Sequence, residues 1–302
     1  MKRILITGKN SYIGTSFEKW MKDNHPSYKI DTISVHGDAW REMDFSPYDV
    51  VFHVAGIAHR KETEENRDLY FQVNHKLAVD VAKKSKISGV KQFIFLSTMS
   101  VYGMTKGAIT EETPLKPKIA YGKSKLMAEN DIRILSSDSF IVSILRPPMV
   151  YGYGCKGNYQ TLSQFAKKTI IFPKVNNKRS MIYIDNLSMF TFMVIKNKQG
   201  GVFLPTNKDY VNTTELIQQI ARINKNKIYY SKFLGYIVNV LSVKIPIFQK
   251  VFGDLYYKET IQSNINNMYF INQVEFKNSI YISEGEDFDC KKQIKSEKEG
   301  FD

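Results

Sequence analysis

Cysteine is scarce in this chain of 302 residues. Cys155 and Cys290 are the two cysteines, far apart and outside any metal-ligand spacing. We therefore expect no disulfide scaffold, no metal site and a reducing, cytoplasmic location. The few apolar residues before Gly8 do not make a signal peptide.

Long unbroken apolar runs are also missing. The apolar-rich residues 233–253 are interrupted by Lys244, Pro246 and Lys250, which argues against a membrane-spanning helix. A flap over substrate or an amphipathic surface helix would both fit this segment, and we favour packing onto the protein over peripheral membrane contact. From Glu284 to residue 302 the chain turns charged and poor in apolar residues, which predicts a flexible tail.

Acidic residues are fewer than basic ones, 30 against 43, for a formal charge of +13. The excess favours an anionic partner. The lysines are spread along the chain and no nucleic-acid-binding module is apparent, so a phosphorylated small molecule is a better candidate than nucleic acid.

Short apolar runs alternate with amphipathic helical segments in the first half of the chain. This alternation predicts an α/β fold with a doubly wound parallel sheet, a Rossmann-like domain over residues 1–150 and a smaller substrate-binding region, with interleaved elements, over 151–283. The expected strands are Arg3–Thr7, Lys29–Val35, Asp49–Val54, Gln92–Ser97 and Phe140–Leu145, and the clearest helices are Val73–Ser85, Lys123–Leu135 and Thr213–Ile223. Residues 37–48 are too few for a full crossover helix, so a turn or short helix should replace it.

A glycine-rich turn follows the first strand, from Gly8 to Gly14, and leads into a helix. Such a turn lets backbone N–H groups and the helix dipole meet a pyrophosphate. Ser11 stands where a middle glycine is usual, so we expect altered affinity for the phosphate, with binding retained.

Two Tyr-x-x-x-Lys pairs occur, Tyr121/Lys125 and Tyr102/Lys106, which is about the number that chance predicts from the composition. An ammonium about 4 Å from a phenol would lower the pKa of the phenol by about 3 units and make it an acid/base catalyst. The pattern alone does not choose between the pairs.

Five motifs in order choose between them. They are Gly8–Gly14, His53–Gly56, Leu96–Gly103, Tyr121–Lys125 and Arg146–Gly152. Together they resemble the extended short-chain dehydrogenase/reductases that act on nucleotide sugars, over residues 2 to about 214. The resemblance implies that Tyr121/Lys125 is the catalytic pair, and it places Tyr102/Lys106 in a loop. His53 by itself is interpreted as a packed, hydrogen-bonded histidine.

The resemblance implies a role for each matching residue. Tyr121 would exchange a proton with the sugar oxygen, Thr98 would hydrogen-bond that oxygen, and Lys125 would lower the pKa of Tyr121 and hold the nicotinamide ribose. Asn74 would support the active site and Asp44 would face adenine. The cofactor-binding set is Gly8, Asn10, Ser11, Tyr12, Ile13, Gly14, His36, Asp44, Phe45, Val54, Ala55, Gly56, Asn74, Ser97, Lys125 and Pro147. The substrate-binding set is Ser100, Tyr121, Met149, Asn158, Phe172 and Arg179, with Arg179 on the diphosphate and Phe172 beside the base, where core packing is a close rival.

Within the family, Met99 and Ser100 stand where hexose dehydratases have an acid and a base, so dehydration is not expected. The motifs look most like reductases of UDP-2-acetamido-4-keto-2,6-dideoxyhexoses, which make UDP-FucNAc or UDP-QuiNAc for capsule or O-antigen. A UDP-sugar 4-epimerase that retains NAD is the alternative. A dinucleotide-binding regulator without activity is an alternative of another class.

The cofactor is NADP or NAD. No acidic residue ends the second strand, where Val35 is followed by His36 and Gly37, and this favours NADP, although Asp38 is close enough to bind an adenosine 2′-OH. The family often dimerises through helices that match Val73–Ser85 and Lys123–Leu135, so a homodimer is an expectation.

Overall fold

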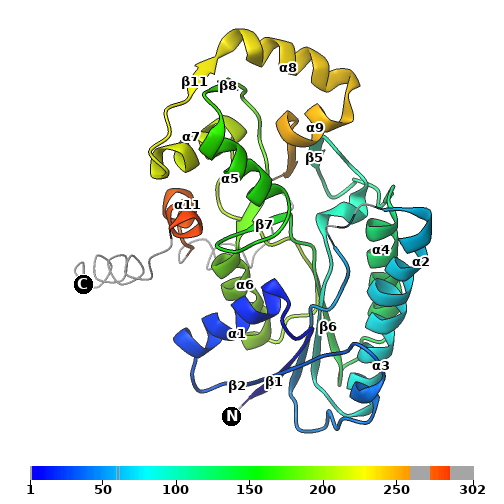
Figure 1. Ribbon diagram of the computed structural model, residues 1–302. Coiled ribbons are helices and arrows are strands. Elements are labelled where there is room, and N and C mark those ends of the chain that lie inside the picture. Colours follow the sequence, from blue (N-terminus) through cyan, green and yellow to red (C-terminus); the bar gives the residue numbers. More distant parts are fainter. Residues whose placement is uncertain (1, 59, 61, 259–272, 286–302) are drawn as a thin grey trace.

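A six-stranded parallel sheet forms the centre of the protein (Figure 1). A computed structural model describes residues 2–58, 60, 62–258 and 273–285. The strand order is β10-β6-β4-β3-β1-β2, and the strands are β1 (Arg3–Thr7), β2 (Lys29–Ile33), β3 (Val50–His53), β4 (Gln92–Leu96), β6 (Ile141–Leu145) and β10 (Gly201–Phe203). The predicted doubly wound α/β fold is confirmed.

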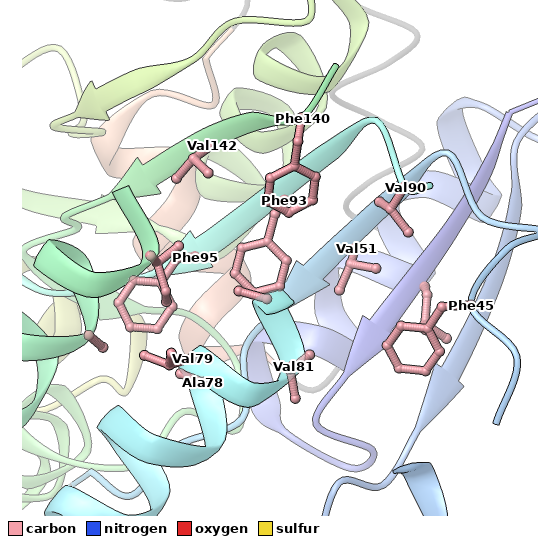
Figure 2. Close-up of a cluster of buried hydrophobic side chains, with 14 of the residues drawn as sticks. Phe45, Val51, Ala78, Val79, Val81, Val90, Phe93, Phe95, Phe140 and Val142 are labelled. Atoms are coloured by element: carbon pink, nitrogen blue, oxygen red, sulfur yellow. The ribbon is translucent and has the colours of Figure 1, made fainter. Parts of the chain in front are cut away.

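Side chains alternate along each strand, so the sheet has an apolar core on both faces. On one face Leu5 and Val51 pack with α3 (Ala78–Ile87) and α4 (Ala120–Arg133), a core shown in Figure 2. On the other face Ile4 and Ile6 pack with α1 (Tyr12–Asn24) and α6 (Ile184–Lys196). Burial on both sides explains why the strands read as continuous Ile, Val and Phe runs.

The five predicted strands are present with ends that differ by at most two residues. The sixth, β10, was not predicted, because it has three residues, begins with Gly201 and lies at a sheet edge. Both α6 and β10 come from beyond residue 150 and return to the first domain. The short connection between β2 and β3 contains the 3₁₀-helix η1 (Ala39–Arg41) in place of a crossover helix, as expected.

A longer helical run than predicted precedes β4. It comprises α2 (Glu64–Phe71), a π-helical segment η2 (Gln72–Leu77) and α3. Thr63 and Asn66 form a capping box at its start. A π-turn shifts the register of the side chains after it, and Asn74 within this segment is fully buried.

Helix α4 begins at Ala120, three residues before the predicted start. The predicted range therefore included Lys125 and left out Tyr121. Both lie on α4, at positions i and i+4, and such side chains share one face of a helix.

The second lobe has its own core, which includes Tyr151, Tyr159, Phe172 and Ile217. Its helices are α5 (Asn158–Lys168), α7 (Thr213–Ile223), α8 (Lys232–Lys244), α9 (Pro246–Phe252) and α11 (Phe276–Glu284). Short parallel pairs join β7 (Met149–Tyr151) to β9 (Met181–Tyr183), β8 (Ile171–Pro173) to β11 (Tyr229–Ser231), and β5 (Gly107–Ile109) to β12 (Leu255–Tyr257). The predicted helix Thr213–Ile223 is α7.

Residues 233–253 form two short helices, α8 and α9, separated at Ile245 with Pro246 at the first position of α9. No helix in the described ranges has the length and apolarity needed to cross a membrane. Glu284, where the flexible tail was expected to start, ends α11 and is paired with Lys167 at 2.9 Å, and residues 286–302 lie outside the described part.

Candidate active site at the carboxyl edge of the sheet

The glycine-rich turn packs against the segment that follows β3. Gly8 has a φ of +128°, and a Cβ there would lie 2.8 Å from the amide nitrogen of Ala55 and 3.0 Å from a methyl of Val54. The amides of Val54 and Ala55 both donate to the carbonyl of Thr7. Only glycine satisfies both the backbone angle and this close approach. The turn therefore presents bare backbone to a phosphate, as a dinucleotide site requires.

Ser11 caps helix α1. Its hydroxyl accepts a hydrogen bond from the amide of Gly14 at 3.2 Å, and a Cβ on Gly14 would lie 2.6 Å from that hydroxyl. Asn10, with φ of +64°, shapes the preceding turn. The first amides of a helix, here those of Tyr12 and Ile13, have no carbonyl within the helix to bind, so they can donate to an anion.

The side chain of Tyr12 does not take part in this anion-binding role. Its hydroxyl is buried, and a Cβ on Gly152 would lie 2.5 Å from it. Burial, followed by the nearby Cys155 and Asp185, raises the pKa of Tyr12. The expected cofactor contact at this position therefore belongs to its backbone.

Charged side chains cluster beyond the end of β2, where an adenosine ribose would lie. Arg41 donates to Asp38 and to Asp80, both at 3.0 Å. His36 is exposed, and its amide donates to Ser34 at 3.2 Å. The sequence did not identify Arg41 as a candidate cofactor-binding residue, because no motif fixes the position of a basic residue in this segment. It is a forked cation of the kind that binds a 2′-phosphate.

Asp44 and Phe45 follow this cluster. The Asp44 carboxylate accepts from the amide and hydroxyl of Ser46, both at 2.8 Å, and these bonds lower its pKa. Phe45 is fully buried in the core below the edge of the sheet. Its side chain contributes packing, and a cofactor could meet only its backbone.

Asn74 links the loop after β3 to helix α4. Its amide oxygen accepts from the N–H of Ile57 at 2.7 Å, and its amide nitrogen donates to the Ile57 carbonyl at 3.0 Å and to Ser124 at 3.3 Å. A Cβ on Gly56 would lie 2.9 Å from Asn74 Oδ1 and 3.2 Å from Lys125 Nζ. The structure thus brings Gly56, Asn74 and Lys125 together.

Tyr121 lies half-buried beside Thr98. A hydrogen bond with Thr98 lowers the pKa of the phenol, but burial raises it by more, so the net direction is upward. The Thr98 hydroxyl accepts from the amide of Ser100 at 3.1 Å and is thereby oriented. The ring of Tyr70 meets that of Tyr121 edge to face, with centroids 6.4 Å apart. Tyr70 was not predicted because it lies in α2, which the sequence did not reveal.

The predicted lowering of the Tyr121 pKa by Lys125 was wrong for this structure. Lys125 is 4% exposed, and its ammonium donates to the carbonyl of Leu96 at 2.8 Å and lies over the ring of Phe95 at 4.6 Å. Burial lowers the pKa of Lys125 to about 8, with an opposing effect from Glu129. Because its ammonium is held at the end of β4, Lys125 is no leading influence on the phenol.

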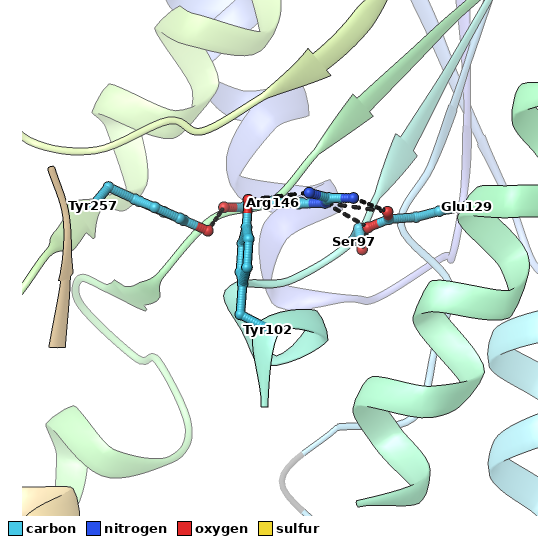
Figure 3. A network of polar contacts seen from close by, with 5 residues as sticks. All are labelled: Ser97, Tyr102, Glu129, Arg146 and Tyr257. Atoms are coloured by element: carbon cyan, nitrogen blue, oxygen red, sulfur yellow. Dashed lines mark hydrogen bonds and ion pairs between the residues drawn. The ribbon is translucent and has the colours of Figure 1, made fainter. Parts of the chain in front are cut away.

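A buried polar network ties β6 to α4 and to the end of β4 (Figure 3). Arg146 donates to both carboxylate oxygens of Glu129, and Glu129 accepts a short hydrogen bond from Ser97. Arg146 also donates to the hydroxyl of Tyr102 at 3.1 Å, and the hydroxyl of Tyr257 donates to its carbonyl at 2.8 Å. The Tyr102 hydroxyl is therefore held in this network, and Tyr102 is not a candidate catalyst. Ser97 serves the same network through its side chain.

His53 is a packed histidine, as expected. It is fully buried between Phe93 and Phe95, with Nδ1 2.7 Å from the Thr7 hydroxyl. Burial, with a smaller effect of Lys125, lowers its pKa to about 3, so the ring is neutral. Pro147, at the next strand end, accepts from the amide of Met99 at 2.9 Å.

The expected substrate residues are distributed over both lobes. Arg179 is partly buried, donates to the carbonyl of Gly253 at 2.9 Å, and has its pKa lowered by burial. Its other N–H groups form a fork suited to a diphosphate. Asn158 is exposed at the first position of α5, and Ser100 and Met149 are partly buried near the strand ends.

Phe172 differs from its expected place beside the base. It is 1 % exposed and packs against Phe165 and Phe252, with ring centroids 5.9 and 5.8 Å away. The rival interpretation, core packing, accounts for this side chain.

The arrangement suits proton transfer beside a bound dinucleotide. Thr98 and Tyr121 place two hydroxyls together. Gly8, Gly14 and Gly56 let the turn and the loop after β3 pack closely, because a Cβ at any of them would lie within 3 Å of another protein atom. These residues fit a nicotinamide dinucleotide, which supplies or accepts hydride when bound.

Comparison with known proteins also indicates a nicotinamide dinucleotide as the cofactor. Residues 4–204 match the model of the NAD dependent epimerase/dehydratase family. The chain is 31% identical over 248 residues to a UDP-glucose 4-epimerase of Vibrio cholerae, a match that covers 73% of this chain and 75% of that one. It is 26% identical over 279 residues to the N-acetyl-alpha-D-glucosaminyl-diphospho-ditrans,octacis-undecaprenol 4-epimerase of Escherichia coli O157:H7, covering 86% and 83% of the two chains.

Among solved structures, a UDP-glucuronic acid 4-epimerase from Bacillus cereus in complex with NAD aligns with a TM-score of 0.72 at 19% identity, covering 93% of this chain and 95% of that one. At this identity the likeness concerns the fold.

Proposed function

Because the chain belongs to the NAD dependent epimerase/dehydratase family, we propose that it reduces the C4 ketone of a nucleotide-activated 2-acetamido-4-keto-2,6-dideoxyhexose with NADPH or NADH. The product would be UDP-FucNAc or UDP-QuiNAc for a surface polysaccharide. The observation that carries the proposal is the hydrogen bond that pairs Thr98 with Tyr121.

The state of Tyr121 supports reduction. Its pKa is raised, so the phenol is protonated at neutral pH and able to give its proton to an oxygen. Reduction of a ketone uses this acid in its one proton transfer, and epimerisation uses the same acid when its keto intermediate is reduced again.

The residues divide the work as follows. Thr98 orients the ketone oxygen, and Tyr121 donates a proton to that oxygen as hydride reaches C4, which gives a secondary alcohol. Lys125, with a pKa of about 8, can exchange protons with solvent near neutral pH, and it would hold the nicotinamide ribose. Arg179 would bind the diphosphate. Dehydration is disfavoured because Met99 and Ser100 carry neither the acid nor the base it needs.

The second candidate is a 4-epimerase on a retained NAD, favoured by the names of the two curated relatives. One relative acts on a UDP sugar and the other on a sugar linked to undecaprenyl diphosphate, and a diphosphate is common to both. Arg179 would serve either carrier. The cofactor also differs: Arg41 and His36 support a 2′-phosphate and hence NADP, and Asp38 supports NAD.

Three incubations distinguish the candidates. Loss of NAD(P)H absorbance with UDP-4-keto-6-deoxy-HexNAc supports the reductase. Conversion of UDP-GlcNAc to its C4 epimer, without net use of cofactor, would replace it with the epimerase. The third incubation uses undecaprenyl-diphosphate GlcNAc. If calorimetry shows that the protein binds NAD(P) but none of the three sugars reacts, the protein would be a non-catalytic dinucleotide-binding regulator.

A further inference from the structure

Helix α8 carries apolar side chains on two opposite faces. Its inner face packs on the lobe, where Val238 is 7% exposed and a Cβ on Gly235 would lie 2.1 Å from the carbonyl of Lys174. On its outer face Phe233 is 73% exposed, Tyr236 69% and Val240 53%. The spacing of three and four residues aligns these three side chains along one stripe of the helix. The packing expected for this segment therefore accounts for the inner face alone.

The two-stranded sheet beside α8 adds to the outer stripe. Tyr229 of β11 is the register partner of Ile171 of β8, and both point away from the core, with 78% and 47% exposure. Ile170 is 72% exposed. We name the set Ile170, Ile171, Tyr229, Phe233, Tyr236 and Val240 the outer apolar face. It lies on the part of the second lobe farthest from β2, at the top of Figure 1.

The positive charge of the protein is concentrated in the same lobe. Residues 156–184 contain six Lys and Arg and no Asp or Glu, and residues 216–253 contain another six and none. These two segments hold 12 of the 43 basic residues and none of the 30 acidic ones, so they carry nearly all of the net charge of +13. They form α5, β8, β11, α8 and α9, which support the outer apolar face. The lysines that the sequence spreads along the chain thus leave one lobe strongly basic.

We propose that the outer apolar face docks the protein on an anionic lipid bilayer. Exposed aromatic and branched aliphatic side chains enter the boundary between headgroups and acyl chains, while the surrounding lysines attract anionic headgroups. Lys225, Lys227 and Lys232 are exposed within a few residues of Tyr229 and Phe233. This mode of attachment needs no spanning helix.

Charge complementarity selects this occupant. A second copy of the chain would bring two strongly basic lobes together, and like charges repel. Nucleic acid would match the charge and could stack on the exposed rings, but it would leave the aliphatic Ile170, Ile171 and Val240 without an apolar partner. An anionic bilayer satisfies both the charge and the aliphatic surface.

The test is co-sedimentation of the full chain with vesicles of phosphatidylcholine alone and with added phosphatidylglycerol. We expect binding to the anionic vesicles that weakens as salt is raised. The double substitution Phe233→Ser with Tyr236→Ser should reduce the partition coefficient by at least ~10-fold. Replacing Lys225, Lys227 and Lys232 by Gln should reduce binding to anionic vesicles. The matched control is Tyr281→Ser on α11, an aromatic residue that is 49% exposed outside the face, and it should bind like wild type.

Three results would overturn the proposal. They are no partition of the wild-type chain into anionic vesicles, equal loss of binding in the Tyr281→Ser control, or a dimer in sedimentation velocity that Phe233→Ser with Tyr236→Ser dissociates. Thermal unfolding of each variant shows that it is folded. Turnover of a water-soluble nucleotide sugar should be unchanged in the double variant, so the docking and the proposed reaction are tested separately.

Discussion

Arg146 and Glu129 form a buried, two-pronged ion pair that joins the end of β6 to helix α4. The Arg146 and Glu129 side chains are 8% and 3% exposed, and the guanidinium Nε lies 3.0 and 3.1 Å from the two carboxylate oxygens. Glu129 is one turn after Lys125 and two turns after Tyr121 on the same helix. The ion pair therefore fixes the helix that carries Tyr121, the proposed proton donor, against the end of β6.

Glu129→Gln should destabilise the fold, because it leaves the Arg146 guanidinium buried without a counter-charge. The free energy of unfolding, measured in urea, should fall by about 3–5 kcal/mol. Glu18→Gln is the control, since Glu18 pairs with Lys22 at the surface of α1 and its loss should cost under about 1 kcal/mol. A loss of similar size in both variants would contradict a structural role of the buried pair.

Tyr121→Phe should retain binding of the dinucleotide, since the change removes one hydroxyl and leaves the cofactor turn intact. Turnover should fall by about 10²–10⁴-fold, the usual contribution of a positioned acid or base. The checks are calorimetric titration with NAD(P)H and single-turnover rates.

Lys106→Met, in the other Tyr-x-x-x-Lys pair, is the control for Tyr121→Phe and should be fully active. Near-normal turnover in Tyr121→Phe would reject the phenol as the proton donor.

Lys125 should make stability depend on pH between about 8 and its ordinary pKa of about 10.4. Burial lowers its pKa in the folded protein to about 8, so in this window the unfolded chain binds more protons than the folded one. The unfolding free energy contributed by this lysine must then rise with pH, by up to about 1.4 kcal/mol for each pH unit.

Lys125→Met should remove that rise, as seen by comparing urea unfolding of both proteins at several pH values from 7.5 upward. Parallel curves for the two proteins would show that the ammonium is not desolvated in the fold.

Gly8→Ala should abolish dinucleotide binding. The added methyl would lie 2.8 Å from the amide nitrogen of Ala55 at a positive φ, so the turn must move away from the strand end that holds it. Gly89→Ala is a control with a positive φ of +79° and no atom within 4 Å of the added Cβ. It should bind the dinucleotide with unchanged affinity and lose only a little stability. If Gly8→Ala and Gly89→Ala lost affinity equally, backbone strain would explain the loss without the contact between the added methyl and Ala55.

The sequence by itself determined five of the six strands of the central sheet. The Ile, Val and Phe runs of β1, β3 and β4 are buried on both faces, so their composition marks them without knowledge of their neighbours. The glycine at position 8 and the pair Tyr121 and Lys125 are local patterns whose spacing is visible in the chain.

Only the tertiary structure decided how these groups behave. The pKa of Tyr121 depends on burial and on Thr98, and the ammonium of Lys125 is held by a carbonyl of another strand, so neither could be calculated from a spacing of four. Arg146 and Glu129 meet because β6 and α4 pack together. The π-turn at Asn74 is a local backbone conformation that no pattern in the sequence predicts. The outer apolar face emerges because packing covers one side of α8 and leaves the other exposed, and a residue's chemistry does not say which side that will be.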